Sequence, residues 1–171
     1  QTGPHAFLSL ARRLGFGAKT GLPLIGEADG LVPTDEWMMQ NHKRKILDGD
    51  TANLSIGQGS MLATPLQVAQ GMAGLANGEA LPKLHLIKQV QSVNGRVLVF
   101  KEPERRNFLH LDETAVEIVR EGMMQVVQAG YGTGRRAKLS YTVLCGKTGT
   151  AQWGPEELEQ RLAWFAGFFP L

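Results

Sequence analysis

The stretch 145–153, Cys-Gly-Lys-Thr-Gly-Thr-Ala-Gln-Trp, constrains the fold of this chain more than any other part of it. The short apolar run 141–144 precedes it and predicts the start of a strand. A second apolar run, 161–169, follows after a polar interval. Two such runs around a short polar connection are typical of a β-hairpin, so we expect an antiparallel pair over 139–153 and 161–169.

The first strand of this hairpin is expected to present Lys147, Thr148 and Thr150 along one open edge. Gly149 has no side chain, so a ligand can lie directly against the backbone at that position. The lysine supplies a fixed positive charge, the threonines supply hydroxyl groups and the strand supplies N–H donors. This combination suits a ligand that carries a carboxylate next to an amide carbonyl.

A phosphate-binding loop is the first alternative, because Gly146-Lys147-Thr148 matches the end of the pattern G-x-x-x-x-G-K-[ST]. The leading glycine of that pattern would fall at position 141, which is Tyr141. The residues that follow Thr148 also lack the apolar period of a helix. The sequence therefore disfavours a nucleotide site.

The extended motif Gly-Lys-Thr-Gly-Thr-Ala-Gln at 146–152, with Ala-Trp-Phe-Ala-Gly-Phe-Phe-Pro at 163–170, resembles the K-T-G element of the serine acyltransferases that bind penicillin. Stretches 15–23, 55–59 and 132–134 strengthen the match. The whole chain resembles the transpeptidase domain of class B penicillin-binding proteins of the elongation type. That resemblance implies an α+β fold of the β-lactamase/transpeptidase type, in which helices pack on the faces of a five-stranded antiparallel sheet.

The resemblance also implies roles for single residues. Lys147 would supply positive potential, Thr148 and Thr150 would bind the terminal carboxylate of the substrate, and the Thr150 N–H would be one oxyanion donor. Gly149 would let the substrate backbone pair with the strand. Further substrate-binding candidates lie on the cleft wall and on a loop at its rim: Gln152, Trp153, Gly132, Thr133 and Gly134.

The nucleophile of the resembling family is the serine of an S-x-x-K motif. No serine of this chain is followed by a lysine three residues later, and Ser92-Val93-Asn94 falls at a predicted hairpin turn. We therefore expect 1–171 to be a partial transpeptidase domain without the S-x-x-K and S-x-N segments and without the last strand and helix. Alone, such a piece should be unable to form an acyl-enzyme and should associate with the remainder of its own domain.

The function implied by the resemblance is that of a peptidoglycan D,D-transpeptidase, which cross-links stem peptides ending in D-Ala-D-Ala through an acyl-serine intermediate. Implied partners are these peptides, β-lactam antibiotics and cell-elongation machinery, at the extracytoplasmic face of the bacterial inner membrane. Two alternatives remain open: a serine β-lactamase-related hydrolase and a non-catalytic binding module of the same fold. We expect no cofactor, no metal and no nucleic acid, since the net charge is only +2, the chain has one cysteine and its four histidines lack ligand spacing.

Start and stop signals predict the remaining elements. We expect helices at 4–14, 65–76 and 113–129, and a short helix that begins after Thr34 as its N-cap. A β-ribbon of 84–91 and 96–100 is expected around the turn Asn94-Gly95, with loops at 20–32 and 41–50. The apolar positions predict the buried faces of the two longest helices. For the 65–76 helix these are Leu66, Ala69, Met72, Ala73 and Ala76, and for the 113–129 helix Ala115, Val119, Gly122, Met123, Val126 and Val127.

Overall fold

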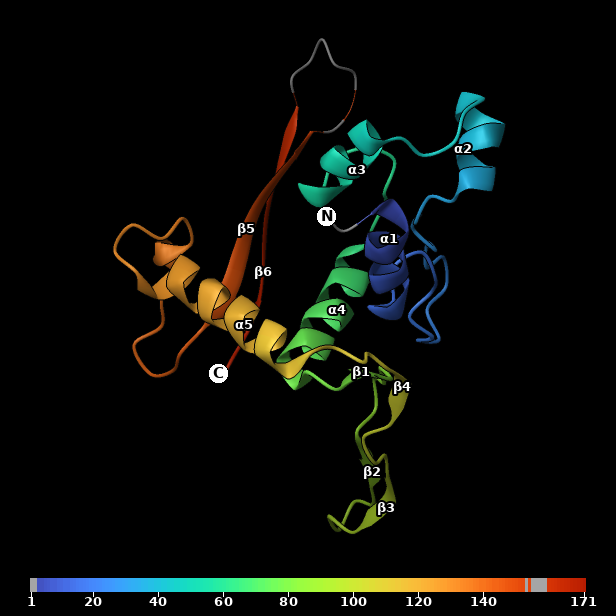
Figure 1. The fold of residues 1–171 in the computed structure, drawn as a ribbon. Helices are drawn as coiled ribbons and strands as arrows, with labels where there is room; N and C mark the ends of the chain where they lie inside the picture. Colours follow the sequence, from blue (N-terminus) through green and yellow to red (C-terminus); the bar gives the residue numbers. More distant parts are fainter. Residues whose placement is uncertain (1–2, 153, 155–159) are drawn as a thin grey trace.

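The structure, a computed structural model, describes residues 3–152, 154 and 160–171. Helices and antiparallel strands both occur, which confirms the α+β class (Figure 1). No helix in these residues is both long enough and apolar enough to cross a bilayer. The helices are α1 Pro4–Arg13, α2 Asp35–His42, α3 Asp48–Ser55, α4 Pro65–Asn77, α5 Glu113–Gln128 and the 3-10 turn η1 Arg135–Ala137.

The strands pair two by two in three antiparallel sheets within the described residues. The long pair is β5 with β6, in an unbroken register from Cys145 opposite Phe168 to Gln152 opposite Arg161. The other pairs, β1 with β4 and β2 with β3, are short. The strands are β1 Ala80–Pro82, β2 Gln89–Gln91, β3 Val97–Phe100, β4 Arg105–Phe108, β5 Cys145–Gln152 and β6 Arg161–Phe168.

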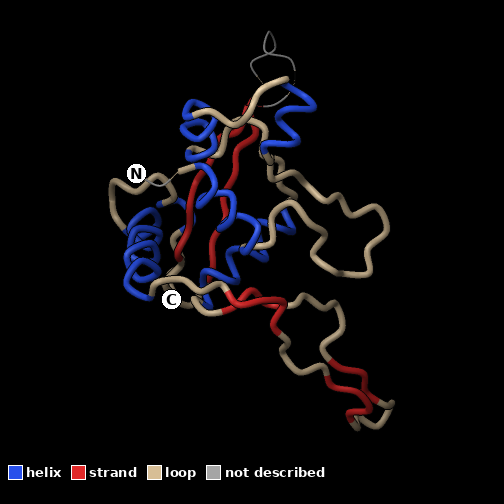
Figure 2. The backbone as a smooth tube through the Cα atoms, turned by 45° about the vertical axis from the view of Figure 1, so that its right-hand side comes forward, coloured by secondary structure: helices blue, strands red, loops and turns tan. Residues whose placement is uncertain are grey.

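Helix α5 lies along β5, and α4 contacts both β1 and β6 (Figures 1 and 2). The residues with no exposed surface include Leu81 of β1, Val127 of α5, Cys145 of β5 and Leu109, which directly follows β4. A second apolar cluster joins α1 to the end of the loop before α2 and to α3 through Leu8, Ala11, Val32 and Leu54. The helices therefore pack on the β5–β6 hairpin as expected.

The ends of α4 were correctly predicted from its sequence. The Thr64 hydroxyl accepts a hydrogen bond from the Gln67 backbone N–H at 3.1 Å, and the Gln67 side-chain oxygen accepts from the Thr64 N–H at 3.0 Å. This reciprocal pair is a capping box. Gly78 ends the helix at a φ of 81°, which a residue with a side chain rarely adopts.

The predicted buried face of α4 is wrong in part. Ala69 is exposed and the other four predicted positions are only half-buried. The fully buried side chains are instead those of Gln67 and Gln70. The Gln67 amide donates to the carbonyls of Ala18 and Asp29, each at 2.8 Å, so burial there is driven by hydrogen bonding to a loop. Two glycines, Gly71 and Gly74, complete the buried face.

Helix α5 begins where predicted, with Asp112 accepting from the Ala115 N–H at 2.9 Å. Its buried residues are Val116, Met123 and Val127, whereas Ala115, Val119 and Gly122 are exposed, against expectation. Hydrogen bonds of Arg120 explain why a different face of α5 is buried than the sequence predicts. Its guanidinium donates to the carbonyls of Leu75 and Ala76 at distances from 2.7 to 3.2 Å, which fixes the α5 face that meets the end of α4.

Two segments differ from the sequence-based expectation. The strand expected from 139 starts only at Cys145, because Phe168 opposite Cys145 is the last ladder partner that β6 offers. Helix α3 starts at Asp48, inside the loop expected over 41–50. The Asp50 carboxylate accepts from the Leu47 N–H at 2.9 Å and from Arg44, which stabilises the first turn of that helix.

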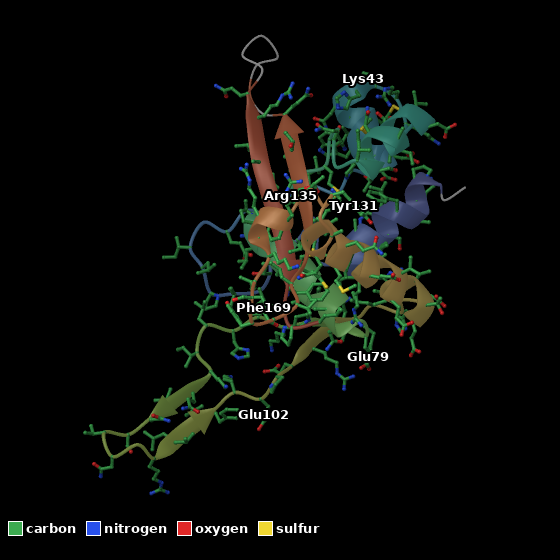
Figure 3. The ribbon with its side chains drawn as sticks, turned by 90° about the vertical axis from the view of Figure 1, so that its left-hand side faces the viewer. Lys43, Glu79, Glu102, Tyr131, Arg135 and Phe169 are labelled. Atoms are coloured by element: carbon green, nitrogen blue, oxygen red, sulfur yellow. The ribbon has the colours of Figure 1, made fainter. Side chains whose placement is uncertain are left out.

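The β2–β3 ribbon confirms the hairpin predicted at Asn94-Gly95. It projects from the body at the end opposite to where β5 ends and β6 begins (Figure 1). Glu102, just beyond β3, lies well outside the helical body (Figure 3). Every residue of both strands is exposed, so the ribbon is peripheral, as expected.

Candidate functional site

Strand β5 places the candidate residues on two faces and one edge. Side chains alternate along a strand, so Lys147 and Gly149 share one face while Thr148, Thr150 and Gln152 share the other. Lys147, Gly149, Thr150 and Gln152 are exposed and Thr148 is half-buried. The sequence predicts Lys147, Thr148 and Thr150 along one open edge; in the structure their side chains lie on the two faces of β5, and the backbone groups of Thr148 and Thr150 lie at that edge.

The edge of β5 away from β6 carries the Thr148 and Thr150 carbonyls. The Thr148 carbonyl accepts from Lys147 Nζ at 2.5 Å, and the Thr150 carbonyl accepts from Gln58 Nε2 at 3.4 Å. Backbone groups of an antiparallel strand point to its two neighbours in alternation. Thr148 and Thr150 thus direct their backbone groups outward, where an added chain can pair with them. Lys147 Nζ folds back onto the same edge, so charge and backbone groups meet there.

The loop after α5 reaches β5 through a hydroxyl pair. The Oγ1 atoms of Thr133 and Thr148 lie 2.8 Å apart and share a hydrogen bond. Gly132 and Gly134 are buried, while Thr133 between them is exposed. A Cβ on Gly132 would come within 2.3 Å of the Val126 carbonyl oxygen. These glycines are needed for the close approach of the loop to the end of α5.

Two hairpin glycines have different surroundings. A Cβ on Gly149 would meet only Trp164 Cβ, at 3.4 Å, which is an ordinary contact. A Cβ on Gly167, opposite Gly146, would lie 2.3 Å from the Cys145 carbonyl oxygen. Gly167 is therefore needed for packing within the hairpin. Gly149 has space above it, which is consistent with a ligand lying there.

A groove of about 580 Å³ lies at the far end of this edge. The Gln58 side chain, which contacts the Thr150 carbonyl, forms part of its wall. Among the described residues, its lining contains three carboxamides and one guanidinium. The lining residues are Asn53, Ile56, Gln58, Gly59, Thr150, Gln152 and Arg161.

Three residues that line the groove were not predicted from the sequence as site residues. Gln58 appeared only as part of the stretch 55–59, and Asn53 and Arg161 had no assigned role. Their closeness to Thr150 depends on how α3 and β6 approach β5, and no motif in the sequence signals it. Trp153, expected on the cleft wall, lies outside the described residues.

The described residues contain no group of three or more histidine, cysteine, aspartate or glutamate side chains that could hold a metal ion. Cys145 is fully buried, and burial raises the pKa of its thiol, so it stays protonated and weakly nucleophilic. The polar groups that the structure brings together at the edge are those of Lys147, the threonines and the backbone.

These features define a lysine–threonine strand edge beside a helix-covered hairpin. Residues 1–171 match the penicillin binding protein transpeptidase domain, and the chain belongs to that family. The relatives it resembles carry the name peptidoglycan D,D-transpeptidase MrdA. That of Acinetobacter baumannii is 40% identical over 141 residues, which are 82% of this chain and 20% of the relative. That of Haemophilus influenzae is 37% identical over 175 residues, 91% of this chain and 26% of the relative.

Solved structures give the same family. Pseudomonas aeruginosa PBP2, in complex with WCK 5153, superposes with a TM-score of 0.78 at 37% identity, over 98% of this chain and 36% of that one. Helicobacter pylori PBP2, in a complex with MreC, gives 0.75 at 30% identity, over 99% of this chain and 30% of that one. The β-lactamase/transpeptidase-like fold is thereby confirmed. The chain spans about a fifth to a quarter of the length of the two curated relatives.

Proposed function

We propose that this chain is the portion of a serine-type D,D-transpeptidase that binds the D-Ala-D-Ala end of a peptidoglycan stem peptide. The observation that carries the proposal is the outward edge of β5, where Lys147 Nζ and the Thr148 and Thr150 backbone groups converge. In this role Lys147 attracts the terminal carboxylate, and the Thr148 and Thr150 hydroxyls bind it. Gly149 admits the substrate backbone, and the Thr150 N–H stabilises the oxyanion. Losing one such donor typically costs about 3 kcal/mol of transition-state stabilisation.

The nucleophile is proposed to lie in the part of the domain that carries an S-x-x-K motif. Its serine attacks the carbonyl between the two D-alanines, the C–N bond breaks and D-alanine leaves with a proton on its nitrogen. An amine of a second stem peptide then takes the acyl group and the serine is restored. The loop Gly132-Thr133-Gly134, together with Gln152 and Trp153, would border the peptide. No cofactor is required by this sequence of steps.

Partners follow from the same proposal. A relative of similar fold, Mycobacterium tuberculosis PBP3, is complexed with aztreonam, which supports β-lactam antibiotics as ligands of the protein that contains this chain. The complex of Helicobacter pylori PBP2 with MreC supports a cell-elongation protein as its partner. Stem peptides are its proposed substrates. The proposed place of action is the extracytoplasmic face of the bacterial inner membrane.

A fluorescent penicillin tests which part of the protein carries the nucleophile. The isolated chain should give no covalent label after denaturing electrophoresis, whereas a longer form that includes an S-x-x-K segment should label stoichiometrically. In that longer form Lys147→Ala should slow labelling at least about tenfold, because one charge-assisted contact is lost. Exposed Lys101 in the loop after β3 offers a matched control, and Lys101→Ala should leave the rate unchanged. Labelling of the isolated chain would contradict the assignment of the nucleophile.

A further inference from the structure

The ribbon of β2 and β3 exposes apolar side chains that no other described element covers. Residues 83–104 all belong to the described part of the chain, and the ribbon projects away from the helices (Figures 1 and 2). A lone two-stranded hairpin is only marginally stable in water, and a third strand or a packing surface is needed for independent stability. Five apolar side chains of the ribbon are between 44% and 59% exposed: Val90, Val97, Leu98, Val99 and Phe100.

The outer edge of β2 is regular and open. Backbone hydrogen bonds of 2.8 Å join the two sides of the ribbon at Lys88 and at Ser92. Backbone groups of an antiparallel strand point to its two sides in alternation, so residues 88, 90 and 92 face β3. Gln89 and Gln91 between them direct their N–H and carbonyl groups outward. Within the described residues β2 pairs with β3 alone, so these groups are available to another strand.

The outer edge of β3 is less suited to pairing, because this strand carries a bulge. Val90 is opposite Val99, but the next residue, Gln91, is opposite Val97. Leu98 is therefore an extra residue on β3. A bulge increases the local twist of a strand and is one of the devices that protect sheet edges from pairing. An added strand is accordingly expected beside β2.

The charges of the ribbon favour an acidic partner. Residues 84–101 contain two lysines, one arginine and no aspartate or glutamate. Lys88 and Lys101 are opposite each other across the ribbon, and like charges in that arrangement are destabilising. The next carboxylates along the chain, those of Glu102 and Glu104, lie beyond β3, and that of Glu104 is already held in an ion pair of 2.6 Å. A carboxylate beside Lys88 would offset this repulsion.

A second copy and a lipid surface fit the ribbon less well than an acidic peptide does. Two copies paired edge to edge would bring like charges together. In hydrocarbon, the outward N–H and carbonyl groups of β2 would lose their hydrogen-bond partners, which is unfavourable. An extended peptide satisfies these backbone groups by adding a strand to the edge, and its side chains can supply the carboxylates.

We propose that the outer edge of β2 binds an extended, acidic segment of another protein as a third strand of the ribbon. Lys88 and Val90 are two residues apart and share one face of β2. A strand beside them would place an acidic side chain next to Lys88 and an apolar side chain next to Val90. The partner segment therefore carries acidic and apolar residues two positions apart. This surface is independent of the proposed function, because the ribbon lies away from β5 (Figure 1).

Two matched peptides test the edge on the ¹⁵N-labelled chain. Acetyl-Thr-Glu-Thr-Val-Thr-Glu-Thr-amide has the expected spacing, and its counterpart has lysine in place of both glutamates. With the glutamate peptide the amide signals of Gln89 and Gln91 should shift, and their exchange with solvent should slow, because their N–H groups gain acceptors. This peptide should bind about tenfold more tightly than the lysine peptide, since a repulsion replaces an attraction of similar size. About 1 M salt should reduce the difference, because the Debye length falls to about 3 Å.

Variants separate the backbone contribution from the charge. Gln89→Pro removes an outward N–H and should abolish binding, whereas Gln89→Ala keeps that N–H and should bind like the wild type. Lys88→Gln should remove most of the preference for glutamate, and Lys138→Gln, at an exposed position in the loop before β5, should leave it intact. Slow exchange of the Lys101 amide, which donates to the Lys88 carbonyl, verifies that each variant keeps its ribbon.

Three results would overturn the proposal. The first is undetectable or equal binding of the two peptides, and the second is a shift at Phe100 in place of Gln89 and Gln91. The third is another occupant: dimerisation through the ribbon in sedimentation, or ribbon shifts caused by phosphatidylglycerol vesicles and not by the glutamate peptide. Each of these leaves the proposed function standing, because that function is read from Thr148 and Thr150.

Discussion

The hydroxyl groups of Thr133 and Thr148 lie 2.8 Å apart, 15 residues from one another along the chain. This contact attaches the loop after α5 to the middle of β5, at the strand position next to Lys147. It places the loop on the Thr148 face and leaves the outward edge of the strand accessible. The loop is therefore part of the frame that holds the candidate site in place.

Replacing Thr133 with valine should weaken this frame without unfolding the chain. The side chain is exposed, so we expect a loss of about 0.5–1 kcal/mol in the free energy of unfolding. Urea titration would measure the loss. Amide exchange should quicken at Gly134, whose N–H donates to the Val126 carbonyl at 2.9 Å in the same loop. Thr114→Val on the exposed face of α5 is the control and should change neither quantity. Unchanged exchange at Gly134 would show that the hydroxyl pair does not hold the loop.

Alanine at Gly167 and at Gly149 should have opposite consequences. At Gly167 the new Cβ would lie 2.3 Å from a backbone oxygen, which cannot rotate away, so we expect a loss of about 2 kcal/mol or more. At Gly149 the nearest atom is at 3.4 Å, so stability should stay within about 0.5 kcal/mol. Thermal unfolding compares the two variants. Gly149→Ala should nevertheless weaken peptide binding, and normal binding by that variant would argue against a ligand lying over Gly149.

Gln67→Leu should be among the most damaging single changes. Gln67 has no exposed surface, and its amide satisfies the carbonyls of Ala18 and Asp29. Leucine is of similar size but leaves those carbonyls without this donor, for which we expect a cost of about 3 kcal/mol. Gln125→Leu on the exposed side of α5 is the matched control, with a change below about 0.5 kcal/mol. Equal effects of the two variants in urea titration would contradict the buried-amide interpretation.

Acid should destabilise the chain partly through Asp50. Hydrogen bonding to Arg44 lowers the pKa of Asp50 to about 2 from 3.8, and the Leu47 N–H contributes to the shift. A carboxyl group with a lowered folded-state pKa stabilises above its unfolded pKa, and this contribution is lost as the pH falls through the folded value. The melting temperature of the wild type should thus fall more steeply than that of Asp50→Asn between about pH 4 and pH 2.

Exposed Glu102 supplies the control for that titration, since Glu102→Gln should keep the wild-type slope. Equal slopes for the wild type and Asp50→Asn would show that the Arg44–Asp50 contact does not persist in solution. Salt should reduce the effect, because both side chains are partly exposed, at 41% for Arg44 and 24% for Asp50.

Local sequence signals were sufficient to predict where a helix begins and ends and where a hairpin turns. The Thr64-Pro65 start of α4, its Gly78 end and the Asn94-Gly95 turn are each determined by a few neighbouring residues, so the sequence predicts them. Buried faces were harder to predict. Gln67 and Arg120 donate hydrogen bonds to carbonyls of distant segments. The spacing of apolar residues along a helix does not predict such contacts.

The candidate site likewise combines residues that a local motif predicts with residues that only the fold brings there. Lys147, Thr148, Gly149 and Thr150 are consecutive and could be named from the motif. The structure directs the backbone groups of Thr148 and Thr150 to the outward edge, and the four side-chain positions alternate between the two faces of the strand. Gln58, in the loop after α3, reaches Thr150 from 92 positions away, and Arg161 lies at this end of the edge because it pairs with Gln152.

The short sheet of β1 and β4 closes the base of the ribbon, because Pro82 is opposite Arg105. The chain therefore leaves the body and returns to it at adjacent points, and residues 83–104 form an excursion that the remaining fold does not need in order to connect. A two-residue turn in their place would give a shorter molecule for crystallisation. The same position would accept a fluorescent or affinity insert far from the edge of β5.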